Sequence, residues 1–198
     1  MINAAIIGLG RWGQNLVNSV QGKSRLIRFV AGAVRTPSKV QEYADSQGMR
    51  LYDDYRKMLA DPAIDAIVLA TPHDLHAELI AAAARAGKHV FTEKPFTMTT
   101  ESAKDAVRAC ARKGLTLAVG YNWRFQPALQ EIRRMLDDGR LGKLLHIEGN
   151  FCGPSVYWYP RDHWRQSKDE GPGGMTGRGV HTLDAMLYLA GQIDTGYA

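Results

Sequence analysis

The chain of 198 residues has little of what defines several classes of protein. Its two cysteines, Cys110 and Cys152, lie outside any Cys-x-x-Cys motif, so neither a disulfide framework nor a zinc site is indicated. No apolar run reaches about 18 residues, and no charged-then-apolar leader opens the chain. We therefore expect no membrane contact and a cytoplasmic location.

The charge of the chain is positive but dispersed. Lys and Arg number 25 against 20 Asp and Glu, a net charge of +5, with no block of five or more basic residues. This pattern predicts a solvated surface that favours anionic small molecules, without a nucleic-acid partner. The spacing of His73 and His76 could suit a metal, but no acidic or cysteine ligand set accompanies them, and we predict no metal site.

What the chain does contain is an alternation of apolar strand-like runs and helix-like segments over its first 120 residues. Such alternation predicts a parallel sheet with helices on both faces. Strands are expected at 3–8, 27–34, 65–70, 88–91 and 116–120, and helices at 12–21, 37–47, 53–60, 73–86 and 100–113.

The composition changes after about residue 122, where we expect a helix at 126–138, a strand at 144–152, a loop at 153–174 and a helix at 175–190. The whole pattern predicts an α/β protein with a doubly wound parallel sheet in a first domain, residues 1–122, and a second segment of different composition, residues 123–198. An unpaired strand and an uncovered helix promote association, so we also expect a homo-oligomer, with mobility of the residues past about 150 as the alternative.

Residues 8–13 read Gly-Leu-Gly-Arg-Trp-Gly directly after the first apolar run. A strand followed by this glycine spacing and a helix is the entry to a dinucleotide-binding unit. We expect Gly8 to allow the tight turn, Gly10 the approach of a pyrophosphate and Gly13 the close packing of helix on strand. Together with Arg11 and Trp12 they form a predicted cofactor-binding loop, for which a tight turn without a ligand is the alternative.

The preference for NAD or NADP depends on the residues at the end of the second predicted strand, which contact the ribose 2′ position. An acidic residue there binds the ribose 2′-hydroxyl of NAD, and residues 33–39 contain none. Arg35 and Lys39 suit the 2′-phosphate of NADP instead, because a guanidinium binds that group bidentately. We predict NADP as the preferred cofactor and NAD as the other, with a solvated Arg35 as the alternative.

Glu93-Lys94-Pro95 follows the predicted strand that ends at Phe91. Ligands of open α/β sheets bind beyond the carboxyl ends of the strands. Lys94 is therefore expected to polarise a substrate oxygen or relay a proton, the alternative being a surface lysine in a turn. Pro95 is a candidate for a cis peptide bond.

Taken together, seven motifs resemble the glucose–fructose oxidoreductase, inositol dehydrogenase and rhizopine-catabolism (Gfo/Idh/MocA) family. In chain order they are Gly8-x-Gly10-x-x-Gly13; Ala70-Thr71-Pro72-His73-x-x-His76; Ala86-Gly87-Lys88-His89-Val90; Glu93-Lys94-Pro95; Gly120-Tyr121-Asn122-x-Arg124-Phe125-x-Pro127; Trp164-Arg165; and Gly173-Gly174 followed by Gly179-x-His181-x-x-Asp184.

The resemblance implies an NAD(P)-dependent oxidoreductase that moves a hydride to or from a sugar, polyol or related small molecule. It implies a Rossmann domain, residues 1–122, and an incomplete C-terminal α/β domain, residues 123–198, for substrate binding or oligomerisation. It also implies Lys94 and His181 as catalytic residues. Gly177 stands where the family often has an aspartate, four residues before the histidine. Either Lys94 and His181 handle the proton without that carboxylate, or the chain is a cofactor-binding relative without turnover, with a regulatory or interaction role.

Further contacts follow from the same resemblance. The residues expected to contact the cofactor are Thr71, Pro72, His76, Glu93, Lys94 and Asn122. For Thr71 the alternative role is a helix cap. The residues expected to contact the substrate are Arg124, Trp164, Arg165 and His181. Interdomain hydrogen bonding is the alternative for Asn122 and Arg124, and buried packing is the alternative for Trp158 and Trp164, whose rings could wall a sugar site.

Overall fold

The computed structural model describes residues 1–158, 160, 163 and 174–197. It divides into unit 1, Met1–Gly120, and unit 2, Tyr121–Ala198. The domain boundary expected from the sequence lies after residue 122.

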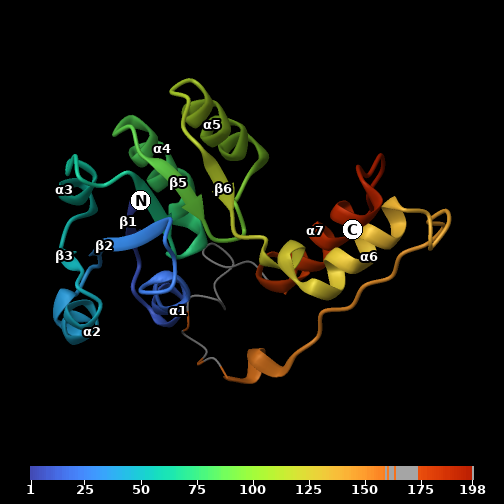
Figure 1. The fold of residues 1–198 in the computed structure, drawn as a ribbon, viewed down its shortest axis with the longest axis horizontal. Coiled ribbons are helices and arrows are strands. Elements are labelled where there is room, and N and C mark those ends of the chain that lie inside the picture. Colours follow the sequence, from blue (N-terminus) through green and yellow to red (C-terminus); the bar gives the residue numbers. More distant parts are fainter. Residues whose placement is uncertain (159, 161–162, 164–173, 198) are drawn as a thin grey trace. The chain divides into compact units, whose positions relative to one another are not determined.

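Unit 1 is built on a six-stranded parallel sheet with the order β3-β2-β1-β4-β5-β6 (Figure 1). The strands are β1 Ile2–Ile7, β2 Ile27–Ala33, β3 Arg50–Tyr52, β4 Ala66–Leu69, β5 His89–Thr92 and β6 Leu117–Val119. The order reverses at β1, which pairs with both β2 and β4. This topology confirms the predicted doubly wound Rossmann sheet.

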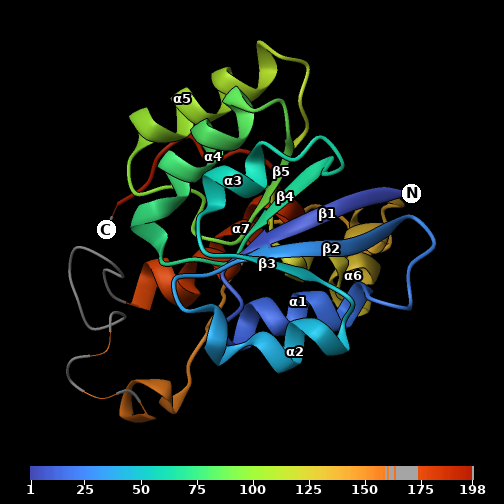
Figure 2. The same cartoon turned by 90° about the vertical axis from the view of Figure 1, so that its left-hand side faces the viewer.

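Helices cover both faces of the sheet, with α1 and α2 on one face and α3, α4 and α5 on the other (Figure 2). The helical segments of unit 1 are α1 Arg11–Val20, η1 Pro37–Lys39, α2 Gln41–Ser46, α3 Tyr55–Leu59, η2 His73–Leu75, α4 His76–Arg85 and α5 Thr100–Ala111. Two buried clusters result, one on each face of the sheet. Residues Ala4–Ile7 of β1 and Ala66–Leu69 of β4 are all apolar, because these central strands contribute side chains to both clusters.

Local signals explain where several helices begin and end. Asp54 accepts a hydrogen bond from the Arg56 amide and caps α3, and Thr99 with Ser102 forms a capping box at α5. Gly87 and Gly114, just after α4 and α5, have positive φ angles, as the predicted helix ends require.

Strand β3 is absent from the sequence-based prediction. It has three residues, Arg50–Tyr52, none of them buried, and so short a run carries no period-2 pattern. It is a strand because it pairs with Ala31–Ala33 of β2 at the edge of the sheet, a tertiary contact that local patterning does not report.

Unit 2 contains helices α6, Pro127–Asp137, and α7, Val180–Ala190. A 3₁₀ turn, η3 Asn122–Phe125, precedes α6, and a π-helical turn, η6 Met175–Gly179, leads into α7, which ends at Gly191 with φ 88°. Another 3₁₀ turn, η4 Pro154–Trp158, lies in the predicted 153–174 loop.

The strand predicted at 144–152 is wrong, because these residues have no regular secondary structure. A strand exists through pairing with a neighbour, and none of the described residues of unit 2 pairs with this segment. It packs on α7 instead, since a Cβ at Gly149 would lie 2.6 Å from Thr182 Cγ2 and 2.9 Å from Met186 Cε.

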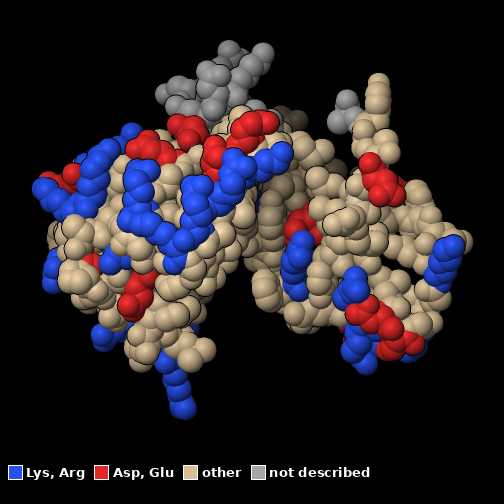
Figure 3. All heavy atoms as spheres, turned by 90° about the horizontal axis from the view of Figure 1, so that it is seen from above, with Lys and Arg blue, Asp and Glu red and all other residues tan. Residues whose placement is uncertain are grey.

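The described helices include none long and apolar enough to cross a membrane. Over α4 and α5, basic side chains are interspersed with acidic ones (Figure 3). Arg108 and Asp105, for example, form an ion pair on α5. This face therefore has mixed charge.

Candidate functional site

The carboxyl ends of the six parallel strands lie along one edge of the unit 1 sheet, where ligands of such sheets bind. Three turns at this edge hold most of the residues predicted for the cofactor. They are Gly8–Gly13 after β1, Thr71–His76 after β4 and Glu93–Pro95 after β5.

Two glycines of the first turn are required by the fold itself. Gly8 has φ +97°, and a Cβ there would lie 2.5 Å from the carbonyl oxygen of Ala70. A Cβ at Gly13 would overlap the carbonyl oxygen of Gly8 and lie 3.4 Å from Ile6 Cδ1. The predicted tight turn at Gly8 and the close helix packing at Gly13 are therefore both present.

Gly10 has no such internal reason to be glycine. Its backbone, φ −67° and ψ −177°, suits any residue, and a Cβ would meet nothing within 4 Å. It is the N-cap of α1 and makes no side-chain cap bond, although Ser, Asp or Asn would stabilise that position. The open space and the uncapped N–H groups fit the pyrophosphate of a dinucleotide.

His76 joins the second and third turns. The ring is fully buried, with Nδ1 2.8 Å from the carbonyl oxygen of Pro95 and Nε2 3.2 Å from that of Thr71. Both carbonyl oxygens only accept hydrogen bonds, so a ring nitrogen that bonds to either of them does so as a donor. Any contribution of His76 to cofactor binding thus comes through the positions of these turns.

The hydroxyl of Thr71 is buried and has no hydrogen-bond partner among the described residues. The alternative role as a helix cap is not present, because η2 and α4 have no side-chain cap. A buried hydroxyl without a partner is costly, so a ligand oxygen or nitrogen at this edge of the sheet is a fitting partner.

In the third turn, the Lys94–Pro95 peptide bond is cis. The carboxylate of Glu93 is nearly buried, at 8% exposure, and its Oε2 accepts a 3.3 Å hydrogen bond from the Lys94 amide. A Cβ at Gly120 would lie 3.0 Å from Glu93 Oε1, which explains the glycine at the end of β6. Lys94 itself is half-buried.

The remaining cofactor residues predicted in unit 1 are exposed. Arg35 follows β2 closely, and Arg11 and Trp12 begin α1. Their side chains are accessible to a ligand, and no acidic residue accompanies Arg35 in the segment after β2.

In unit 2, His181 is buried on α7 and contacts two aromatic rings. Trp123 is stacked on it, with ring centroids 5.4 Å apart and an interplanar angle of 17°. Phe151 meets it edge-on at 6.2 Å and 62°. Two contacts from different directions restrict how the imidazole can tilt.

The face of α7 that carries His181 also carries Asp184, whose side chain is 7% exposed. Arg124 donates to it from Nε at 2.8 Å and Nη2 at 2.6 Å. These hydrogen bonds raise the pKa of the Arg124 guanidinium. Burial, and then the nearby carboxylate of Asp184, raises the pKa of the Tyr121 phenol. Arg124 therefore has a bond within unit 2, which limits the donors it can offer to a substrate.

Gly177 lies in η6, and a Cβ there would meet nothing within 4 Å. Asn122 opens η3 and is exposed. The exposed fraction of Trp158 is 71%, so buried packing does not describe it. Trp164 and Arg165 lie outside the described residues.

Two contacts were missed by the sequence-based site. Trp123 lies within the Tyr121–Phe125 motif, but nothing in the spacing connects it with His181. The sequence could have placed Asp184 beside His181, because residues three apart on a helix share a face and Asp184 follows His181 by three. It does not indicate that Arg124 is the partner of Asp184.

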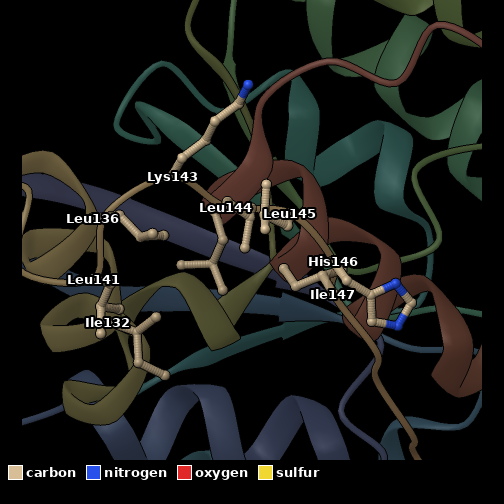
Figure 4. A pocket seen from close by; sticks show the side chains of 9 residues that line it. Ile132, Leu136, Leu141, Lys143, Leu144, Leu145, His146 and Ile147 are labelled. Atoms are coloured by element: carbon tan, nitrogen blue, oxygen red, sulfur yellow. The ribbon is translucent and has the colours of Figure 1, made fainter.

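A pocket of about 330 Å³ lies elsewhere in unit 2 and contains none of the predicted site residues. Leucine and isoleucine side chains of α6 and of residues 141–147 line most of it, and the amine of Lys143 points away from them (Figure 4). It is an apolar surface separate from the polar residues described above.

Comparisons with known proteins identify the family of the chain. Residues 2–121 match the oxidoreductase family with an NAD-binding Rossmann fold, Gfo/Idh/MocA, and residues 129–198 match the C-terminal domain of that family. The uncharacterized oxidoreductase YrbE of Bacillus subtilis is 36% identical over 195 residues, 96% of this chain and 54% of that protein. The scyllo-inositol 2-dehydrogenase (NAD(+)) of the same bacterium is 33% identical over 153 residues, 75% of this chain and 44% of that protein.

A solved structure, a putative NADPH-dependent oxidoreductase from Desulfitobacterium hafniense, matches with a TM-score of 0.88 and 28% identity, covering 96% of this chain and 55% of that one. The chain thus spans about half the length of the curated relatives it matches. On the match of the family model to residues 2–121, the chain belongs to the Gfo/Idh/MocA family of NAD(P)-dependent oxidoreductases.

Proposed function

We propose that this protein transfers a hydride between a nicotinamide cofactor and a carbinol or carbonyl carbon of a sugar, polyol or related small molecule. The observation that carries the proposal is Gly10, an open and uncapped helix N-terminus at the same sheet edge as Lys94. The buried Thr71 hydroxyl and the scyllo-inositol dehydrogenase among the relatives support it.

A nicotinamide cofactor, when bound, would supply the hydride chemistry. Lys94 stabilises the substrate oxygen by donating a hydrogen bond, which favours the charge that develops there. His181 accepts the hydroxyl proton during oxidation and returns it during reduction. The N-terminus of α1 would hold the pyrophosphate of that cofactor. Trp164 and Arg165 remain predicted substrate contacts.

For the cofactor we propose NADP in preference to NAD. Arg35 is exposed after β2 without an acidic neighbour in that segment, which suits a 2′-phosphate. One relative is named for NAD(+) and one similar structure for NADPH, so the two cofactors are to be compared directly.

The test is a calorimetric titration with NADP and NAD, followed by nicotinamide absorbance with a panel of inositols and sugars. Lys94→Ala should lower kcat by about 10²–10⁴ and change cofactor affinity much less. Lys104→Ala, an exposed lysine of α5, is the matched control. Near-normal turnover of Lys94→Ala would remove Lys94 from the mechanism.

The second candidate function is cofactor binding without turnover, and Gly177 favours it. Binding of NADP or NAD with no absorbance change across the panel would support it. Because a side chain at position 177 has open space, Gly177→Asp should fold normally and show whether a carboxylate there raises activity. The proposed homo-oligomer is tested separately by sedimentation of the chain.

A further inference from the structure

His181 is fixed by aromatic rings that belong to two separate segments of unit 2. The stack with Trp123 is nearly parallel, at 17° and 5.4 Å. Trp123 also contacts Phe151, with centroids 4.9 Å apart, so the three rings contact one another. Since Gly177 has no side chain, a carboxylate at that position does not set the orientation of the imidazole.

The stacked indole is itself held on α7. Arg124, the next residue of η3, makes a two-point ion pair with Asp184, three residues after His181 and on the same helix face. The turn η3 therefore contacts this face of α7 through two neighbouring side chains, one aromatic and one charged. A bidentate guanidinium–carboxylate pair defines orientation as well as distance.

The other ring is anchored independently. The Arg178 guanidinium lies 5.5 Å from the centre of the Phe151 ring and donates a 2.8 Å hydrogen bond to the carbonyl oxygen of Gly153. Residues 151–153 are thereby attached to the turn that precedes α7.

We propose that Trp123 is a positioning residue for His181: the indole, fixed by the Arg124–Asp184 pair, holds the imidazole in the orientation that proton exchange with substrate requires. This inference rests on the proposed function for its consequence in catalysis. Its structural part, the stacked geometry, can be measured without substrate.

The experiment uses the full chain with Trp123→Leu, Trp123→Phe and, as a matched control, Phe125→Leu in the same turn, whose ring is 76% exposed. Imidazole proton resonances are recorded by NMR, with His181→Gln for assignment. In the parent, the indole ring current should shift the His181 resonances upfield. Trp123→Leu should abolish that shift, Trp123→Phe should keep part of it, and Phe125→Leu should keep all of it.

In steady-state assays, Trp123→Leu should lower kcat on the order of 10- to 100-fold, as expected for a displaced catalytic group, with cofactor affinity unchanged and partial rescue by Trp123→Phe. Unchanged His181 resonances in Trp123→Leu, or a parent-like kcat, would overturn the inference. If the parent shows no turnover with any substrate, the proposed function fails, and the resonances of His181 still decide whether Trp123 positions it.

Discussion

The three glycines of the first turn look equivalent in the sequence but have different physical roles. Gly8 and Gly13 are needed because a Cβ would strike backbone atoms, whereas Gly10 leaves an open space at an uncapped helix N-terminus. Because the fold does not require glycine at position 10, we attribute this glycine to the binding of a ligand.

Substitutions at these positions should separate folding from binding. Gly10→Asp should abolish cofactor binding, because a carboxylate would occupy the pyrophosphate position, while stability stays equal or rises slightly since Asp is a preferred N-cap. Gly13→Ala should instead destabilise the fold by about 1–3 kcal/mol through overpacking. Calorimetric binding and urea unfolding of both variants check this. Retained binding in Gly10→Asp would contradict the cofactor assignment.

Arg35 is a second position where one side chain should decide one property. Arg35→Ala should weaken NADP on the order of tenfold more than NAD, a difference of about 1.4 kcal/mol, because only NADP carries the 2′-phosphate. Arg25→Ala, an exposed arginine before β2, is the control. Equal losses for the two cofactors would show that Arg35 does not bind this phosphate.

At the scale of elements, the turns after β4 and β5 are joined by His76, which begins α4. His76→Leu should leave the carbonyl oxygens of Thr71 and Pro95 without their imidazole contact and lower the free energy of unfolding by about 1–3 kcal/mol. It should also weaken cofactor binding by displacing the turns. His146→Leu, an exposed histidine, is the control. A free energy of unfolding equal to that of the parent would show that the contacts of the buried imidazole with these turns do not stabilise the fold.

At the scale of the whole molecule, the two buried clusters lie entirely within unit 1, whereas α6 has no buried residue. Local stability follows buried apolar contacts. Hydrogen exchange should therefore be slowest at the amides of β1 and β4 and faster in α6. Equal protection of α6 and β1 would mean that unit 2 is stabilised by contacts beyond those seen in its described residues.

The sequence by itself determined the elements whose signals are local. Apolar runs marked β1, β2, β4, β5 and β6, and glycine spacing marked the turn into α1, because strand burial on both faces and positive φ constrain residue type directly. Five of the six parallel strands followed from these runs, and the resemblance to the family followed from the motifs between them. The sequence also predicted distinct roles for Gly8, Gly10 and Gly13. Only the packing distances showed that a side chain would clash at Gly8 and Gly13 but has open space at Gly10.

The tertiary structure decided what depends on partners distant in the chain. β3 is a strand because β2 lies beside it. Residues 144–152 have a strand-like apolar pattern but no described strand to pair with. The stacking of Trp123 on His181 and the bond of Arg124 to Asp184 join residues about sixty apart. Such contacts arise from the packing of η3 on α7, since ring stacking and ion pairing need proximity that no local spacing encodes.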